Sequence, residues 1–282
     1  MKSLTSLLES AEIKRLKSNL ENHGSVLVAF SGGVDSSFLL KAAVDFLGPD
    51  QVLAVTASSA AYPDHERKEA RELADKLGVE WKEMESSETE NPNFRENPTD
   101  RCYFCKKELF EDLKALAERE GINKVVDGTI QDDTEGHRPG TRATEELGIT
   151  SPLQEAGLTK EEIREFSKRV GLETWDKPSF ACLASRFPYG EEITEKKLDR
   201  VGRAEEFLLE LGINQFRVRH HGDIARIEIR GQDFDRLVNS RKQVVSHLKE
   251  LGYNYVTLDL EGYRTGSMNE PLSLEKSGSQ ED

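Results

Sequence analysis

The sequence predicts an α/β protein: a doubly wound parallel sheet followed by a smaller C-terminal α/β domain of α-β-β-α-β order. Over the first half of the chain, short apolar runs rich in Val and Leu alternate with amphipathic helical stretches. That alternation is typical of parallel strands joined by crossover helices. From Glu192 the pattern changes to helix, two alternating strands, helix and strand. The change indicates a separate small domain.

The elements of the first domain follow from hydrophobic periodicity. Leucines at helical spacing predict a helix between Met1 and Asn22, which Gly24 would end. The polar stretch 83–100 contains prolines and asparagines and is expected to form a loop or lid. Strands are expected at 26–30, 51–56 and 124–127, and further helices at 38–44, at 64–77 with Gly78 as its end, and at 106–120.

The second domain is expected to begin after residue 190. We predict a first domain over 1–190, a small α/β domain for substrate binding or oligomerisation over 191–268, and a mobile tail over 269–282 that is rich in Ser, Glu and Asp. The small domain is expected to contain a helix at 194–211, strands at 216–219 and 224–229 joined by a turn at 221–223, a helix at 234–251 and a strand at 253–260.

Composition excludes several classes of protein. The 282 residues are 36% hydrophobic, enough for one large or two modest cores. The 39 basic and 53 acidic residues give a net charge of -14, which argues against nucleic acid or an anionic membrane as a partner. No apolar run approaches the ~20 residues of a membrane span, and no signal peptide is evident. We therefore expect a cytoplasmic protein.

The turn that follows the first predicted strand is the main candidate site. Ser31-Gly32-Gly33-Val34-Asp35-Ser36-Ser37 connects that strand to a helix, so its backbone N–H groups lie at a helix N-terminus. The hydroxyls of Ser31, Ser36 and Ser37 add neutral donors, which suits a phosphate. The Walker A lysine is absent, as is the G-x-G-x-x-G spacing of dinucleotide sites. Hydrolysis at a γ-phosphate is therefore not the first expectation.

This segment resembles the PP-loop, S-G-G-x-D-S, of the ATP pyrophosphatase superfamily. The resemblance implies that Ser31, Gly32, Gly33, Ser36 and Ser37 grip the β,γ-pyrophosphate of ATP while a substrate oxygen attacks the α-phosphorus. Asp35 would be catalytic and would help to hold Mg²⁺, which prefers carboxylate oxygens beside phosphates. The alternative is a glycine turn between strand and helix, capped by serines.

A second motif, Asp127-Gly128-Thr129-x-x-Asp132-Asp133 with Arg138-Pro139-Gly140 downstream, is similar to another PP-loop signature, although Ile130-Gln131 replaces its usual Asn. Ligands of doubly wound sheets bind at the carboxyl ends of strands. Thr56, Gly128 and Asp132 are therefore expected to contact the nucleotide or its metal. A turn with solvated charges is the alternative for this segment.

Three cysteines, Cys102, Cys105 and Cys182, are an odd number for a disulfide scaffold. A structural zinc site would need a fourth ligand, and no second C-x-x-C exists. A thioredoxin-like dithiol would leave Cys182 unexplained. Three inert thiols are another interpretation. An iron–sulfur cluster held by three thiolates, with one iron left open, is the interpretation we favour.

Three longer segments, together with the PP-loop, closely resemble the LarE family. They are P-S-F-A-C-L-A-S-R-F-P-Y-G at 178–190, R-V-R-H-H-G-D at 217–223 and L-E-G-Y-R-T-G-S-M-N at 260–269. The resemblance covers nearly all of the chain. It implies an ATP-dependent sulfur transferase that adenylates a carboxylate of pyridinium-3,5-biscarboxylic acid mononucleotide and replaces oxygen with sulfur, on the route to the nickel-pincer nucleotide of lactate racemase.

The family resemblance also implies two ways of delivering sulfur. In one subtype a single cysteine, matching Cys182, gives up its own sulfur, becomes dehydroalanine and works once. In the other subtype three cysteines bind a 4Fe-4S cluster whose open iron carries an extra sulfide, and the protein turns over repeatedly. Because Cys102 and Cys105 accompany Cys182, we predict the second subtype, with Cys182 catalytic in either case.

Arginines are expected to contact the substrate. Arg217 and Arg219 alternate along a predicted strand, so their side chains share one side of it and could clamp a phosphate. An exposed basic strand face is the alternative. Arg186, in the A-C-L-A-S-R element, is also expected at the substrate.

The expected partners are a small-molecule nucleotide and a sulfide donor, and a homo-oligomer is compatible with the sequence. Two other functions stay open. A PP-loop tRNA thiolase would share adenylation and a three-cysteine cluster, but it predicts a basic face or an added zinc domain, which neither the net charge nor the cysteine count indicates. A nucleotide-binding regulatory module would bind ATP without releasing pyrophosphate.

Overall fold

The computed structural model describes residues 1–134, 139–178, 181–264 and 266–269. Contacts divide the chain into two units. The first comprises Met1–Phe94 and Thr99–Phe180, and the second comprises Arg95–Pro98 and Ala181–Asp282. The division therefore lies at 180/181, where the sequence predicts 190/191. Of the predicted tail 269–282, all but Asn269 lies outside the described residues.

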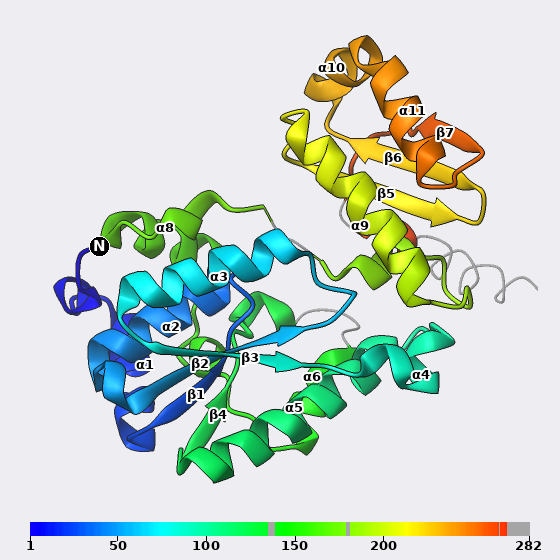
Figure 1. Cartoon of the computed structure of the whole chain (residues 1–282). Coiled ribbons are helices and arrows are strands. Elements are labelled where there is room, and N and C mark those ends of the chain that lie inside the picture. The colour runs from blue at the N-terminus through cyan, green and yellow to red at the C-terminus, as the bar shows by residue number, and fades with distance from the viewer. Residues whose placement is uncertain (135–138, 179–180, 265, 270–282) are drawn as a thin grey trace, which may run out of the picture. The chain divides into compact units, whose positions relative to one another are not determined.

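The first unit contains a four-stranded parallel sheet in the order β3-β2-β1-β4 (Figure 1). The central strand β1 pairs with β2 on one side, Val26 opposite Val52, and with β4 on the other, Val26 opposite Lys124. The chain thus leaves β1 in one direction for β2 and β3 and returns to the opposite side for β4. The strands are β1 (Val26–Ala29), β2 (Val52–Ser58), β3 (Glu80–Glu85) and β4 (Lys124–Val126).

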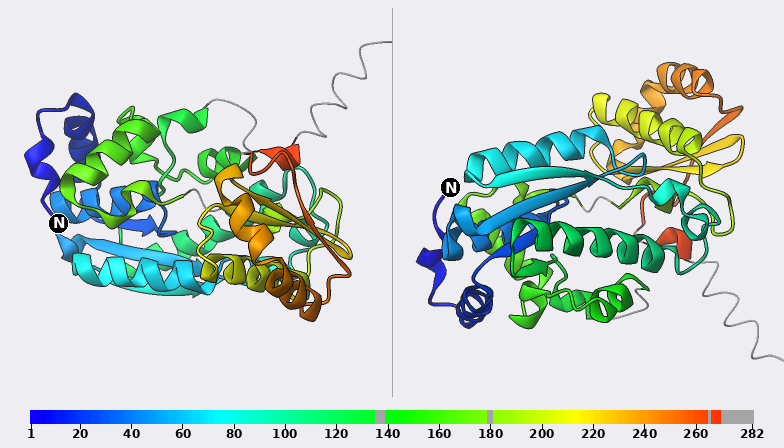
Figure 2. Two further views of the ribbon diagram at one scale, coloured as in Figure 1. Left: turned by 90° about the horizontal axis from the view of Figure 1, so that it is seen from above. Right: turned by 60° about the horizontal axis from the view of Figure 1, so that its bottom comes forward.

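Helices cover both faces of this sheet, which confirms the doubly wound prediction (Figure 2). Val26 and Val28 point into a core shared with α1, α2, α3 and α8. Leu27 points into a separate core against α5. Successive residues of a strand face opposite sides, so a buried run of apolar residues supplies both cores. The helices are α1 (Ala11–His23), α2 (Val34–Leu47), α3 (Asp64–Leu77), α4 (Pro92–Arg95), α5 (Arg101–Glu120), α6 (Pro139–Glu146), α7 (Pro152–Glu155) and α8 (Lys160–Val170).

Two predictions for this unit are wrong in part. The stretch 83–100 is not only a loop, because β3 runs through Glu85 and short helices follow at Glu88–Glu90 and Pro92–Arg95. The single helix predicted over the first 22 residues is a 3-10 turn at Leu4–Leu7 and then α1, whose start Ser10 caps by accepting from the N–H of Ile13. Ser10 therefore starts a new helix within the stretch that the leucine spacing alone predicts to be one helix.

The second unit has the predicted α-β-β-α-β order and a three-stranded sheet, β5-β6-β7. Strands β5 and β6 are antiparallel, whereas β6 and β7 are parallel. The helix predicted over 234–251 is two helices, because Ser240 ends one and begins the next. The elements are α9 (Glu195–Glu210), β5 (Phe216–His221), β6 (Ile224–Ile229), α10 (Phe234–Asn239), α11 (Arg241–Glu250) and β7 (Tyr255–Leu258).

The short segment Arg95–Pro98 packs within the second unit. The N–H of Ile193 donates to the carbonyl oxygen of Arg95 at 2.8 Å. Asn97 is completely buried and has a left-handed φ of 53°. Its Nδ2 donates to the carbonyl oxygen of Pro188 at 2.7 Å, and its own carbonyl accepts from the N–H of Gly190 at 2.9 Å. A residue from the middle of the first unit's sequence thus belongs to the interior of the second.

No helix within the described part of the chain is long and apolar enough to cross a membrane.

Candidate functional site

A cavity of about 290 Å³ lies at the carboxyl ends of β1, β2 and β4. This is where the chain switches direction across the sheet, the usual ligand position in such folds. The predicted residues Ser31, Thr56 and Gly128 all line it: Ser31 and Gly128 follow β1 and β4, and Thr56 lies near the end of β2. The structure therefore brings together segments that lie far apart in the sequence. Further lining residues come from the PP-loop, from α3 and from α5, and they include Gly33, Asp35, Ser36, Glu66, Cys105, Lys106, Phe110 and Asp133.

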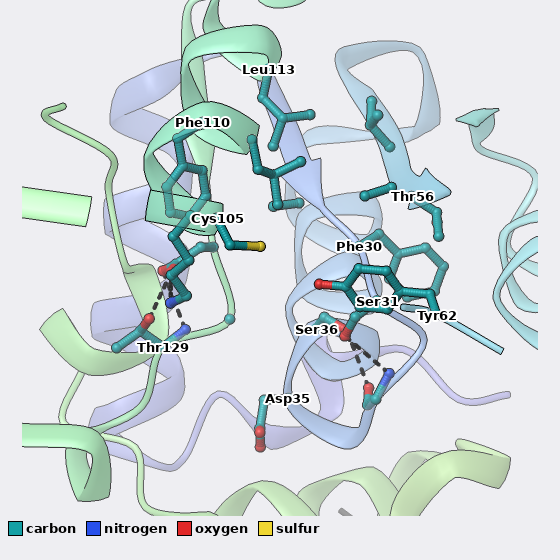
Figure 3. A pocket seen from close by; sticks show the side chains of 18 of the residues that line it. Phe30, Ser31, Asp35, Ser36, Thr56, Tyr62, Cys105, Phe110, Leu113 and Thr129 are labelled. Carbon is teal, nitrogen blue, oxygen red and sulfur yellow. Dashed lines mark hydrogen bonds and ion pairs between the residues drawn. The ribbon is translucent and has the colours of Figure 1, made fainter. Parts of the chain in front are cut away.

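The phosphate-binding character of the loop rests on its backbone. Gly32 has a left-handed φ of 71°, and a Cβ there would lie 3.1 Å from the Cβ of Ala70. Only glycine suits that position. Gly33 then caps α2 without a side-chain hydrogen bond, so the first N–H groups of this 14-residue helix are available to an anion. The hydroxyls of Ser31 and Ser36 lie 3.1 Å apart at the same place (Figure 3).

The PP-loop and the second motif, which begins at Asp127, pack directly against each other. A Cβ on Gly128 would come within 3.0 Å of the backbone nitrogen of Ser36, so only glycine allows the approach. Asp127 shapes the second loop from inside. Its carboxylate accepts from the hydroxyl of Thr129 at 2.6 Å and from that of Ser151 at 2.6 Å. The carboxyl end of β4 is thereby held beside the start of α2.

The side chains of three predicted nucleotide contacts are placed differently. Ser37 is fully buried, is not among the residues lining the cavity, and its hydroxyl has no hydrogen-bond partner among the described residues. Thr56 lines the cavity, but its hydroxyl accepts from the indole of Trp81 at 2.9 Å. Asp132 is exposed and accepts from the N–H of Lys160 at 3.1 Å, whereas its neighbour Asp133 lines the cavity.

Lysines near the loop were missed by the sequence analysis. Lys160, at the start of α8, donates to both carboxylate oxygens of Asp35 at 2.8 and 2.6 Å. Lys106 lines the cavity from α5, with its Nζ 3.9 Å from Asp127. Both ammonium groups therefore stand where a polyphosphate would need counter-charge. In the sequence they resemble ordinary surface lysines of amphipathic helices.

The C-x-x-C pair begins α5, and one of its thiols faces the cavity. Cys105 is half-buried and lines the pocket, whereas Cys102 is exposed on the same first turn (Figure 3). The Sγ of Cys105 lies 2.7 Å from a carboxylate oxygen of Glu88, and the other oxygen of Glu88 accepts from Ser59 at 2.5 Å. Glu88 is only 2% exposed and is a further residue that the sequence analysis missed.

The residue types suit both implied metals. Cys102 and Cys105, the second and fifth residues of α5, supply thiols, the ligand type that iron–sulfur clusters use. Asp35 and Asp133 supply carboxylate oxygens beside the phosphate loop, as Mg²⁺ requires. Among the described residues, no three Cys, His, Asp or Glu side chains are gathered into a group that could hold a metal ion. Cys182, the third thiol, belongs to the second unit.

Arg186 organises the turn that carries Cys182. The arginine is completely buried, and its guanidinium forms a two-pronged pair with Glu205, with both N–O distances 2.8 Å. A third nitrogen donates to the carbonyl oxygens of Ala181 at 2.9 Å and of Cys182 at 3.3 Å. Removing the Glu205 carboxylate would leave a buried charge unpaired, which typically costs about 3–5 kcal/mol. Arg186 thus fixes the backbone on both sides of the thiol.

Arg217 and Arg219 share one side of β5, as the strand period predicts, but they do not form an exposed basic face. Their exposed fractions are only 7% and 5%. Arg219 is paired with Glu228 at 2.8 Å and also donates to Ser267. Burial, and then the charge of Arg186, lower the pKa of Arg217 to about 10. Arg217 is therefore a buried cation whose charged form a bound anion would stabilise.

Comparison with known proteins is consistent with this geometry. The NAD synthase family matches residues 10–101, the part that contains the PP-loop. The pyridinium-3,5-bisthiocarboxylic acid mononucleotide synthase of Lactiplantibacillus plantarum is 39% identical over 88% of this chain and 90% of its own length.

Two uncharacterised proteins are also similar along nearly their whole length. One, from Synechocystis, is 44% identical over 95% of this chain and all of its own. The other, from Methanocaldococcus jannaschii, is 30% identical over 89% of this chain and 96% of its own. The PP-loop, the cavity and these relatives show that the chain belongs to the LarE family of ATP-dependent sulfurtransferases, within the PP-loop ATP pyrophosphatase superfamily.

Proposed function

We propose that this enzyme uses ATP to activate a carboxylate of pyridinium-3,5-biscarboxylic acid mononucleotide and then replaces an oxygen of that group with sulfur. The observation that carries the proposal is the single cavity that holds both the PP-loop and the thiol of Cys105. The name of the Lactiplantibacillus relative, a bisthiocarboxylic acid mononucleotide synthase, supports the choice of substrate.

The activation step is an exchange at phosphorus. A carboxylate oxygen of the substrate attacks the α-phosphorus of ATP, the bond to the bridging oxygen breaks, and pyrophosphate leaves with its electron pair. The loop amides at Gly33 and Ser36 and the ammonium groups of Lys106 and Lys160 are suited to stabilise that leaving charge. Mg²⁺ held by Asp35 and Asp133 would share it.

The apolar half of the cavity suits the adenine ring. Phe30 and Val55 line it from the sheet, and Leu109, Phe110 and Leu113 line it from α5. An apolar lining beside a phosphate loop matches the two ends of a nucleotide. ATP would then place its base against α5 and its phosphates at the start of α2.

Sulfur transfer completes the reaction. A sulfur nucleophile adds to the carbonyl carbon of the acyl-adenylate, the carbon–oxygen bond to AMP breaks, and a thiocarboxylate remains. A 4Fe-4S cluster on Cys102, Cys105 and Cys182, when bound, would supply that sulfur as a sulfide on its open iron. A sulfide donor would replenish it. The product would serve the synthesis of a nickel-pincer nucleotide, the cofactor of lactate racemase, as expected for the LarE family.

A cytoplasmic location belongs to the same proposal. The reaction consumes ATP, and none of the three cysteines is in a disulfide. Both suit a compartment that is reducing and supplied with ATP.

The nature of the products tests the activation step. With ATP, the pyridinium dicarboxylate nucleotide and a sulfide donor, we expect pyrophosphate and AMP in equal amounts, because the loop lacks the lysine of γ-phosphate enzymes. The products can be separated by anion-exchange chromatography and quantified. Mainly ADP and orthophosphate would contradict adenylation, and ATP binding without turnover would favour a regulatory module.

Arg217 is proposed to bind the substrate's phosphate. Arg217→Lys keeps a positive charge but removes the planar fork, so affinity for the pyridinium mononucleotide should fall by about tenfold. Isothermal titration calorimetry on the variant measures it. Arg236→Lys is a matched control, since Arg236 lies on α10 and donates to the carbonyl oxygen of Gly212. Unchanged affinity in Arg217→Lys would remove Arg217 from the site.

A further inference from the structure

Lys177 lies at the end of the first unit's sequence, yet its ammonium group reaches the PP-loop. The Nζ atom donates to the carbonyl oxygen of Gly32 at 3.2 Å. It also donates to Glu66 at 2.6 Å and to Glu69 at 2.7 Å, both on α3. The lysine side chain is only 14% exposed. Neither the mechanism above nor the family signatures use this contact.

The position of Glu66 makes the contact important. Glu66 is among the residues that line the cavity, and its side chain is 11% exposed. A carboxylate with little solvent around it repels a polyphosphate more strongly than an exposed one. Burial alone would lower the pKa of Lys177, but the charge of Glu66 and the hydrogen bonds that the ammonium group donates to Glu66 and Glu69 raise it. The lysine is therefore a cation at neutral pH.

The hydrogen bond to Gly32 has a second effect. The carbonyl of Gly32 and the N–H of Gly33 belong to one trans peptide, so they point in opposite directions. An ammonium that holds the carbonyl oxygen on one side of the loop fixes the N–H direction on the other. Gly33 lines the cavity and caps α2. Lys177 thus fixes the orientation of an amide at the phosphate site.

We propose that Lys177 is a positioning residue of the ATP site, which neutralises Glu66 and fixes the Gly32–Gly33 peptide so that the loop presents N–H groups rather than negative charge to the phosphates. The inference rests on ATP binding at the loop, which is part of the proposed function. Lys177 itself need not touch the nucleotide.

The test compares MgATP and inorganic pyrophosphate binding in matched variants by calorimetry. In Lys177→Met, both ligands should bind about tenfold to thirtyfold more weakly, because the Glu66 charge is exposed to the phosphates. The KM for ATP should rise by a similar factor, with kcat for pyrophosphate release changed less than about threefold. Lys177→Arg should keep most of the affinity. Lys76→Met is the control, since Lys76 pairs with Glu173 on the surface.

A double variant distinguishes the effect of the unpaired Glu66 charge from a general loss of structure in Lys177→Met. Glu66→Gln in the Lys177→Met background should restore most of the affinity, whereas Glu69→Gln, which is more exposed, should restore little. Glu66→Gln alone should bind MgATP at least as well as the wild type, and this holds even if Lys177→Met does not fold.

Three results would overturn the inference: unchanged binding in Lys177→Met, no rescue by Glu66→Gln, or weakened binding in Glu66→Gln alone. Failure of the wild-type enzyme to bind MgATP would instead contradict the ATP site itself, and the inference with it.

Discussion

Replacement of Asp35 by Ala is expected to abolish pyrophosphate release, with kcat/KM falling by roughly a thousandfold or more. Asp35 lines the cavity at the first turn of α2, and Lys160 holds both of its carboxylate oxygens. Without the carboxylate, the proposed Mg²⁺ would lose a ligand, and Lys160 would lose the group that orients it. Initial rates of pyrophosphate release with saturating substrate measure the loss.

Two further variants make the Asp35 result specific. Asp35→Asn keeps the shape and removes the charge, so it should be nearly as inactive as Asp35→Ala. Asp50→Asn removes an exposed carboxylate of the same unit and should retain full activity. Thermal unfolding of all three should be similar, because the Asp35 pair is partly solvated. Pyrophosphate release by Asp35→Ala within tenfold of the wild type would refute a role for this carboxylate.

Replacement of any one of Cys102, Cys105 and Cys182 by Ser is expected to remove repeated sulfur transfer and most of the bound iron. Three thiolates and an open iron are a unit, so loss of one ligand should affect the whole group. Pyrophosphate release should persist in Cys102→Ser and Cys182→Ser. In Cys105→Ser it should fall by several-fold at most, because this residue lines the ATP cavity but offers no charge to the phosphates. Iron content, counted turnovers and pyrophosphate release are measured on anaerobically purified protein.

The mass of the reacted wild-type protein decides between the two sulfur sources. If Cys182 is a sacrificial donor, the protein becomes lighter by the mass of H₂S, and only the Cys182 variant is inactive. If the three thiols share a cluster, the polypeptide mass stays unchanged after several turnovers. A dehydroalanine at residue 182 would therefore eliminate the cluster mechanism, and iron retained in the Cys102 and Cys105 variants would do the same.

Most of the fold could be predicted because its strands are buried on both faces. Strand β1 is a continuous apolar run, and such runs are easily seen. Strand β3 was missed since its sequence, Glu80-Trp81-Lys82-Glu83-Met84-Glu85, is mostly charged. It lies at the edge of the sheet, where solvent rather than a second core covers much of its surface. The charged residues obscure the alternation expected of a strand, although β3 pairs with β2.

Residues of the candidate site could be predicted where they belong to a local motif, and could not where they depend on a distant partner. Gly32 and Gly128 could be predicted because each belongs to a short recognisable motif, although the atoms that exclude a Cβ there belong to Ala70 and Ser36, in distant segments. Lys160, Lys177 and Glu88 could not, because each is defined by a partner from a distant segment: Asp35, Glu66 and Cys105. A charged side chain is usually solvated, so nothing local distinguishes these three. Arg186 was predicted at the substrate, and its pairing with buried Glu205 depends on a helix that comes later in the chain.

The insertion of Arg95–Pro98 into the second unit affects how the chain folds during synthesis and where it can be divided into fragments. The polypeptide passes between the units after residues 94, 98 and 180. On the ribosome, the four residues emerge long before their partners near Pro188 and Ile193, so the second unit cannot close until most of the chain is synthesised. A fragment that begins at Ala181 would lack Asn97 and lose its hydrogen bonds to the carbonyl oxygen of Pro188 and from the N–H of Gly190. The gene therefore has no single point at which it can be divided into two self-sufficient halves.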